Sequence, residues 1–267
     1  RKEILLRSHC VRKDEIKMFQ GFYTLTSGVL TQNRNLNVIS NNMSNATTPG
    51  FKADRFVISD FYNEMMIRTG NKNKSDTTRI GTMSLIAGGD ETVTDYEQGV
   101  VSVSSSTLDF SIVGEGFFAI QTDNGTVYTR NGNFSLDDQG YLCLPGVGRV
   151  LGQNGTIYLG TDRILASENG GIYNEATGAL LGQLMVVDFA DYAQLNKENN
   201  NVYTTNANAA ASDAQIKWKT LENSNADPVE QMTRMMASQR ALQSSAQILS
   251  IYDQLVTQMT TKLGPTG

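Results

Sequence analysis

The pattern of the chain changes at one segment, Asn41-Asn42-Met43-Ser44-Asn45-Ala46-Thr47-Thr48-Pro49-Gly50-Phe51-Lys52. Before this segment, apolar residues recur at the spacing of a helix. After it, glycine and asparagine punctuate the chain at the spacing of short strands. Asn, Ser and Thr compete for backbone hydrogen bonds, and Pro-Gly cannot continue a helix. The segment therefore predicts a bend at which a first helix ends.

The residues before the bend predict an amphipathic helix that begins at Met18. Its apolar residues are spaced three and four apart, with Gln32 at the one missing step. They are Phe22, Leu25, Val29, Leu36, Ile39 and Met43. These positions form a stripe about 100° wide, the narrow face of a helix that packs against one partner helix. The predicted helix holds roughly 24 residues and is about 36 Å long.

The other end of the chain predicts a second, longer helix. Asp227-Pro228-Val229-Glu230 resembles a capping box with Pro at the first helical position, and Gly264-Pro265 ends the helix. Between these signals lie roughly 36 residues, or about 54 Å of helix. A partner helix of about 36 Å cannot cover that length, so part of the second helix is expected to lack an intramolecular partner.

The second half of this helix carries a broad apolar surface. Its apolar residues spread over about half of the circumference, wider than one partner needs. They are Ile248, Leu249, Ile251, Tyr252, Leu255, Val256, Met259 and Leu263. Because an exposed apolar surface of this extent marks an interaction site, we expect other copies or related chains to cover it. The alternative is that the central domain folds back over it.

The centre of the chain predicts short strands joined by tight turns. Of the 24 glycines, 18 lie between Gly81 and Gly182, which confines the turn-rich part to the centre. Apolar Leu108, Phe110 and Ile112 alternate with their neighbours, and the alternation resumes at Phe118 and Ile120. Hairpin turns are signalled by Asn124-Gly125, Asn131-Gly132, Asn154-Gly155 and Asn169-Gly170. Regular short strands of this kind imply a sandwich or an open barrel.

Together these patterns predict an α+β fold. The terminal helices, within residues 18–50 and 226–264, are expected to pair as a coiled coil. Residues 51–225 are expected to form a mostly-β central domain, with a mobile loop near 69–78. Residues 1–17 are interpreted as a leader or extension that need not be native, because Met18 opens the periodic segment and no secretory signal is recognisable.

Composition excludes several classes of function. The chain has 22 basic and 27 acidic residues and a net charge of −5, with the acids scattered, which argues against a nucleic-acid binder. No apolar run approaches the ~20 residues that a membrane span needs, so no membrane insertion is expected. Cys10 and Cys143 form no disulfide framework or metal pair. We predict no cofactor and no metal site.

Catalytic motifs are weak or missing. Gly114-Glu115-Gly116-Phe117-Phe118-Ala119 fits a dinucleotide-binding pattern, but strand alternation resumes after it, so no helix N-terminus can hold a phosphate. His9 is the single histidine, which excludes a Ser-His-Asp triad. The acid pairs Asp90-Glu91 and Asp137-Asp138 could serve glycan cleavage, although adjacent acids in turns are more often solvated. We predict that the chain is not an enzyme.

Four motifs resemble those of the bacterial flagellar rod and hook family. The first is the run of residues 37–52, which ends in the bend quoted above. The second is Leu108-Asp109-Phe110-Ser111-Ile112-Val113-Gly114-Glu115-Gly116-Phe117-Phe118, and the third is Tyr128-Thr129-Arg130-Asn131-Gly132-Asn133-Phe134. The fourth is Ser224-Asn225-Ala226-Asp227-Pro228-Val229-Glu230-Gln231-Met232 followed by Ser238-Gln239-Arg240-Ala241. The four stand in the family's order and cover both ends and the centre.

This resemblance implies a structural axial subunit of the flagellar rod in the basal body. In the family, the terminal helices pair as a coiled coil that lines the inner tube, and copies stack helically into the drive shaft between motor and hook. Family members leave the cytoplasm through the flagellar type III export apparatus without a cleaved signal. The implied partners are other copies, related rod and hook subunits and the export apparatus. The chain leaves no room for the outer domain of hook proteins, which favours a rod subunit.

We predict one set of subunit-contact residues on each terminal helix. They are Leu25, Val29, Leu36, Ile39 and Met43 on the first helix, and Leu249, Tyr252, Leu255, Val256 and Met259 on the second. The helix-exit motif is Asn41, Asn42, Asn45, Pro49, Gly50 and Phe51, whose asparagine side chains are expected to bond backbone groups. The alternative function is a β-rich carbohydrate-binding or glycan-cleaving domain whose helical ends dimerise.

Overall fold

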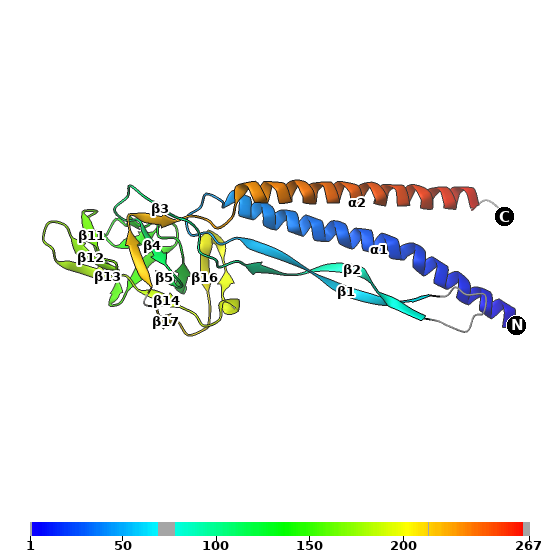
Figure 1. Ribbon diagram of the computed structural model, residues 1–267, viewed down its shortest axis with the longest axis horizontal. Helices are drawn as coiled ribbons and strands as arrows, with labels where there is room; N and C mark the ends of the chain where they lie inside the picture. Colours follow the sequence, from blue (N-terminus) through cyan, green and yellow to red (C-terminus); the bar gives the residue numbers. More distant parts are fainter. Residues whose placement is uncertain (1, 69–77, 213, 264–267) are drawn as a thin grey trace. The chain divides into compact units, whose positions relative to one another are not determined.

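The computed structural model describes residues 2–68, 78–212 and 214–263 (Figure 1). The described part has one α-helix at each end of the chain and all of its strands between them, which confirms the α+β class. The loop predicted near 69–78 lies outside the described residues except for Thr78. Neither α-helix, over its described residues, is apolar enough to cross a membrane.

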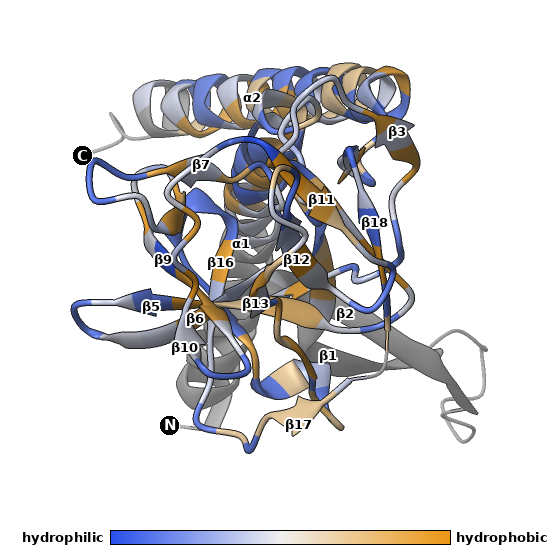
Figure 2. Ribbon diagram, turned by 90° about the vertical axis from the view of Figure 1, so that its left-hand side faces the viewer, coloured by the Kyte–Doolittle hydropathy of each residue, from blue (hydrophilic) through white to orange (hydrophobic). Residues whose placement is uncertain are grey.

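The first helix is longer than the sequence analysis predicted. Helix α1 spans Lys2–Ser44 and helix α2 spans Pro228–Leu263. The predicted start at Met18 is therefore wrong, because residues 2–17 contain neither Gly nor Pro and nothing interrupts the helix there. With 43 residues in α1 and 36 in α2, the inference that α2 outruns a shorter partner is also wrong. Hydrophobic and hydrophilic segments alternate along α2 (Figure 2).

A two-stranded antiparallel ribbon follows α1 in the sequence. Strand β1 (Asp54–Arg68) pairs with strand β2 (Thr78–Thr94), from Asp54 opposite Thr94 to Arg68 opposite Thr78. Register irregularities interrupt the pairing at four places, and such bulges increase the twist of a ribbon. The sequence analysis placed these residues in the β domain and did not identify the ribbon.

The chain divides into two compact units, which are described separately. The first unit comprises Arg1–Asn42, Asp54–Thr94 and Val229–Gly267, and the second comprises Met43–Ala53 and Asp95–Pro228. The ribbon thus belongs to the same unit as the terminal helices. The domain boundaries drawn from the sequence at residues 50 and 226 remain a prediction.

The second unit is built on a sheet of short antiparallel strands. The main strand order is β15-β16-β6-β5-β9-β8-β7, and β10, β14 and β17 extend it. These strands are β5 (Phe117–Thr122), β6 (Gly125–Thr129), β7 (Ser135–Leu136), β8 (Leu142–Leu144), β9 (Gly148–Gly152), β10 (Gly155–Thr156), β14 (Val186–Asp188), β15 (Asn196–Lys197), β16 (Val202–Thr204) and β17 (Ala210–Ala211). Two 3-10 turns, Tyr192–Gln194 and Asn199–Asn201, flank β15.

Three smaller sheets complete this unit. One has the order β11-β12-β13, formed by β11 (Ile164–Ala166), β12 (Gly171–Asn174) and β13 (Leu180–Gln183). In the second, β4 (Phe110–Val113) pairs with β18 (Gln215–Trp218). In the third, β3 (Val101–Val103) pairs with β19 (Thr220–Glu222). The last two pairs join residues near 100–113 to residues just before α2, so the C-terminal part of the unit closes on its start.

Strand β5 separates two hydrophobic clusters. Phe118 and Ile120 lie in the larger cluster with Phe110 and Ile112, as the predicted alternation requires. Phe117, on the opposite face, lies in a second cluster that is rich in aromatic rings. All of these side chains are buried, and burial of each stabilises the fold by about 1.5–3 kcal/mol.

The predicted hairpin signals are partly confirmed. Gly125 lies opposite Thr122 at the end of the β5–β6 hairpin, so Asp123-Asn124 forms the turn beside the predicted pair. The signal at Asn131-Gly132 is wrong, because β6 and β7 do not pair. Instead, the Gly132 carbonyl accepts the Phe110 N–H at 3.1 Å, and a Cβ on Gly132 would lie 1.8 Å from the Phe110 carbonyl oxygen. A close approach of two backbone segments explains this glycine.

Candidate functional site

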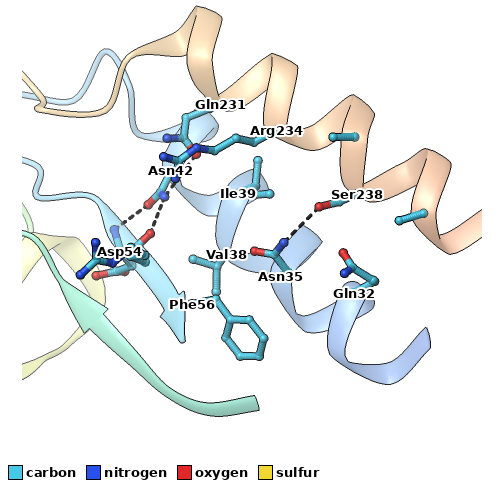
Figure 3. A pocket seen from close by; sticks show the side chains of 13 residues that line it. Gln32, Asn35, Val38, Ile39, Asn42, Asp54, Phe56, Gln231, Arg234 and Ser238 are labelled. Atoms are coloured by element: carbon cyan, nitrogen blue, oxygen red, sulfur yellow. Dashed lines mark hydrogen bonds between the residues drawn. The ribbon is translucent and has the colours of Figure 1, made fainter. Parts of the chain in front are cut away.

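The exit of α1 is held by the side chain of Asn42 (Figure 3). Its Oδ1 accepts the backbone N–H of Asp54 at 2.9 Å, and its Nδ2 donates to the Asp54 carbonyl at 2.7 Å. The same Nδ2 lies 3.5 Å from Oε1 of Gln231 on α2. Asn42 is only 2% exposed. One buried amide therefore joins α1, β1 and α2, and these bonds offset the cost of removing it from water.

Two further contacts join α1 and α2 in a single antiparallel register. Nδ2 of Asn35 donates to Oγ of Ser238 at 3.0 Å. At Gly21, a Cβ would lie 3.1 Å from the hydroxyl of Tyr252, so the tyrosine side chain covers the glycine. Along α1, Asn35 lies seven residues before Asn42, and Gly21 lies fourteen residues before Asn35. Their partners move by the same steps forward along α2, which is the relation expected for antiparallel helices.

The positions that link these contacts follow a heptad on both helices. Each one is buried or half-buried, and the spacing alternates between four and three residues. On α1 they are Gly21, Leu25, Gly28, Gln32, Asn35, Ile39 and Asn42, and on α2 they are Gln231, Met235, Ser238, Leu242, Ser245, Leu249 and Tyr252. We call these fourteen positions the seam. The seam contains more polar and glycine residues than apolar ones.

A groove of about 400 Å³ opens beside the seam, within the same unit. It is lined by side chains of α1, α2 and the start of β1 (Figure 3). Asn35, Ile39 and Ser238 contribute from the seam, and Phe56 contributes from β1. Short side chains on α2, among them Ala241, leave the groove open. The lining holds amides, one hydroxyl, apolar groups and the charged side chains of Asp54, Arg55 and Arg234, and it contains no cluster of acids or histidines.

The second unit holds the chain segments next to both helices through a group that we call the clasp: Gly50, Lys52, Arg130, Glu222 and Asn225. Gly50 donates its N–H to the Glu222 carbonyl at 2.7 Å. Its φ is +67°, and a Cβ would lie 2.4 Å from the backbone of Arg130. Only glycine fits there, for both conformational and steric reasons.

A buried ion cluster forms the centre of the clasp. Nζ of Lys52 lies 2.6 Å from Oε1 of Glu222, and a guanidinium nitrogen of Arg130 lies 3.3 Å from Oε2. All three side chains are at most 4% exposed. Burial lowers the pKa of the Lys52 ammonium below its ordinary value of 10.5, and the Glu222 carboxylate opposes that shift. The Lys52 ammonium also donates to the Glu97 carbonyl at 2.6 Å.

Asn225 closes the clasp from the C-terminal side. Its Oδ1 accepts the Ala53 N–H at 2.7 Å, and its Nδ2 donates to the carbonyls of Asp95 and Glu97. Its own N–H donates to the Phe51 carbonyl at 3.3 Å. The segment that leaves α1 is thus bonded to the segment that enters α2 through backbone groups as well as charges.

The structure distributes the predicted subunit-contact residues between covered and exposed positions. Ile39 is buried, while Leu25, Val29, Leu36 and Met43 are half-buried. On α2, Leu249 and Tyr252 are half-buried, whereas Leu255, Val256 and Met259 are 51%, 38% and 49% exposed. Leu25, Ile39, Leu249 and Tyr252 lie in the seam. The other residues lie outside it.

The predicted helix-exit residues lie on both sides of the bend. Asn41 is exposed and Asn42 forms the contacts described above. The Asn45 carbonyl accepts the Thr48 N–H at 3.1 Å, within a turn that ends at half-buried Pro49. Gly50 belongs to the clasp, and the Phe51 ring is 1% exposed beneath the ammonium of Lys197, which lies 4.1 Å from the ring centroid.

Several residues of the site were missed by the sequence analysis. Lys52 and Arg130 lie inside quoted motifs, but nothing in the local pattern marks them as a buried ion cluster with Glu222. Gln231 and Ser238 lie in the fourth motif, but they interrupt the apolar spacing of α2, and no contact with the first helix was predicted for them. A heptad count on α2 that started from Gln231 could have identified the seam.

No group of three or more metal-ligating side chains occurs among the described residues. Gly114 and Gly116 lie in the turn between β4 and β5, where no helix begins. Asp137 of the predicted acid pair accepts the Tyr141 N–H at 2.8 Å and pairs with Arg149 at 2.8 Å, which assigns it a structural role in its turn.

Three family models match the chain in order. The model described as Flagella basal body rod protein matches residues 22–52, and Flagellar hook protein FlgE/F/G D1 domain matches residues 111–173. Flagellar basal body rod FlgEFG protein C-terminal matches residues 219–261. The first and third models cover every seam residue except Gly21, and all of the clasp except Arg130.

Characterised relatives carry names from the same group. The chain is 37% identical over 139 residues to the flagellar basal-body rod protein FlgG of Caulobacter vibrioides, across 48% of this chain and 53% of that relative. It is 28% identical over 251 residues to FlgF of the same organism, across 92% of this chain and 99% of FlgF. The flagellar hook protein FlgE of Treponema pallidum is 31% identical over 140 residues, 30% of its length. The chain spans about half the length of the FlgG relatives that it matches.

Proposed function

The chain belongs to the family of flagellar rod and hook proteins, and on that premise we propose that it is a structural axial subunit of the flagellar rod. In this proposal it polymerises through its terminal helices into the drive shaft between motor and hook. The supporting observation is the match of family models to both ends and the centre, in one order. A subunit of this kind is not an enzyme and needs no cofactor.

The two terminal helices pair as an antiparallel coiled coil in this proposal. Support comes from the three contacts Asn42–Gln231, Asn35–Ser238 and Gly21–Tyr252, which share one register. The heptad spacing of the seam on both helices gives further support. Because the seam contains few apolar residues, the pair gains little from hydrophobic burial, and neighbouring subunits supply the rest.

The exposed apolar residues of α2 form the surface for those neighbours. Ile248, Ile251, Leu255, Val256 and Met259 are between 38% and 56% exposed, and they lie within three turns of one helix. Single exposed apolar residues are common, but a cluster of five on one helix end marks an interaction site. Other copies and related rod or hook subunits cover it in the assembled rod.

The subunit works in the basal body of the flagellum in this proposal. It reaches that place through the flagellar export apparatus, without a cleaved signal. The carbohydrate-binding alternative gains no support, because the matched models and relatives carry flagellar names. Its remaining test is direct: purified chain should show no saturable binding to peptidoglycan fragments.

Electron microscopy of basal bodies tests the proposed function. Cells that lack this chain should have basal bodies that stop at the inner-membrane ring, whereas the wild type should show complete rods and hooks. Intact rods in the deletion strain would overturn the proposal. In complementation, Leu255→Asp should fail to restore rods, because it places a charge in a desolvated contact. Gln254→Asp, at an exposed polar position of the same turn, is the matched control and should restore them.

A further inference from the structure

The seam carries similar residue types at intervals of seven, a property that the antiparallel register alone does not explain. In the observed register, Asn35 meets Ser238 and Gly21 meets Tyr252. If α2 moved by one heptad, Asn35 would face Ser245, and Gly28 would face Tyr252. Asparagine would still meet serine, and glycine would still meet tyrosine. The displacement is about 10.5 Å along the helix.

Apolar packing does not distinguish these registers well. In the displaced register, Leu25 would face Val256 in place of Leu249, and Ile39 would face Leu242 in place of Met235, so both would still face apolar residues. Exchanging one apolar partner for another of similar size costs little. The side chains that bury most apolar area therefore leave the register open.

Asn42 differs from the other seam residues because contacts outside α2 already hold its side-chain amide in place. Its two bonds to the backbone of Asp54 hold the side chain in one orientation. From that position its Nδ2 reaches Oε1 of Gln231, and both side chains are buried, at 2% and 5% exposure. Displacement of α2 by a heptad would remove Gln231 from this position. In one direction Asn42 would face Ser238, whose side chain is shorter than that of Gln231 and does not reach the amide that Gln231 meets at 3.5 Å; in the other direction Asn42 would face the segment before α2. A buried polar group without its partner costs about 1–3 kcal/mol.

We propose that Asn42 determines the register of the terminal helices, with Gln231 as its partner on α2. A single buried asparagine is known to fix register in helix pairs at some cost in stability. The inference rests on the helix pairing in the proposed function and adds the residue that selects one pairing from several. It assigns to the α1 exit a role beyond ending the helix.

Chemical cross-linking of the purified full-length chain tests the register. In a background with Cys10→Ser and Cys143→Ser, Ser245→Cys is combined with Gly28→Cys, Asn35→Cys or Gly21→Cys, and each protein is treated with a short bismaleimide. The first pair reports the observed register, and the other two report displacement by one heptad in each direction. Gly28 has open space around the position of a Cβ, so its cysteine fits.

We expect the Gly28–Ser245 pair alone to cross-link efficiently in this background. Adding Asn42→Ala should raise the yield of a cross-link that reports a displaced register about tenfold relative to the yield of the Gly28–Ser245 cross-link. This is the effect of losing one buried hydrogen-bonded contact. Gln231→Met, which keeps the size and helix propensity, should act in the same direction and guards against misfolding of the first variant. Asn37→Ala, at an exposed position of α1, should change nothing.

Equal yields of all three pairs before Asn42 is changed would overturn the proposal. So would an unchanged product ratio in both the Asn42→Ala and the Gln231→Met proteins. Absence of every cross-link would show that the helices do not pair in the free chain, and would overturn the register proposal with the pairing. The role as a rod subunit is decided separately, by microscopy of the deletion strain.

Discussion

Nζ of Lys52 lies 2.6 Å from Oε1 of Glu222, and both side chains are 1% exposed. The two residues are 170 positions apart in the chain. They follow the first helix and precede the second, so their contact holds together the two segments from which the terminal helices extend. Since Arg130 shares the same carboxylate, removal of Glu222 would leave two buried cations without their common partner.

Glu222→Gln should lower the free energy of unfolding by about 3–5 kcal/mol, because breaking a buried ion cluster leaves uncompensated charge. Chemical denaturation of the purified chain, followed by tryptophan fluorescence of Trp218, measures the change. Glu230→Gln is the matched control: Glu230 also lies 2.6 Å from its partner Arg234, but both are about half exposed. That variant should lose less than about 0.5 kcal/mol. Equal losses in the two variants would show that the cluster is not desolvated in solution.

Gly50→Ala should destabilise the second unit by more than about 2 kcal/mol, since the new Cβ adds a steric clash to the strain of a positive φ. Gly178→Ala isolates the conformational part of the cost. Its φ is +66°, almost the same as at Gly50, but no atom lies within 4 Å of the new Cβ. This control should lose about 1 kcal/mol. Thermal unfolding of the two variants compares them, and a loss at Gly50 no larger than at Gly178 would contradict the close approach to Arg130.

Gly28→Ala should stabilise α1 by about 0.5–1 kcal/mol, because alanine is the better helix former and the added methyl group meets no neighbour. Gly21→Ala should gain less, because its Cβ would lie 3.1 Å from the Tyr252 hydroxyl. Helix content measured by circular dichroism as the chain is heated reports both effects. Equal gains in the two variants would contradict the covering of Gly21 by Tyr252.

Acid should destabilise the fold in part through Asp137. The Tyr141 N–H, together with Arg149 and the Gln139 N–H, lowers the pKa of the Asp137 carboxyl below its ordinary value of 3.8. A lowered folded-state pKa means that this stabilisation is present above pH 3.8 and is lost as the pH falls through the folded-state pKa. Asp137→Asn should therefore make the free energy of unfolding fall less steeply as the pH is lowered through the acid range. Asp138→Asn, at the exposed neighbouring residue, should leave that dependence unchanged.

Local sequence signals correctly predicted several elements, for a simple reason. The end of α1 near Ser44, the start of α2 at Pro228 and the β5–β6 hairpin depend on Pro, Gly, Asn and capping residues within a few positions. The backbone preferences of these residues act without help from the rest of the molecule. The predicted start of α1 at Met18 was wrong because the apolar periodicity begins there, although no helix-breaking residue lies before it.

Periodicity and short motifs are enough to predict the α+β class, the position of the bend and the resemblance to the flagellar rod and hook family. The contact of α1 with α2 through Asn42, Asn35 and Gly21, rather than through the apolar stripe alone, is visible only in the folded molecule. The same holds for the buried cluster of Lys52, Arg130 and Glu222. Contacts of this kind depend on distances between residues far apart in the chain, and no local preference encodes such a distance.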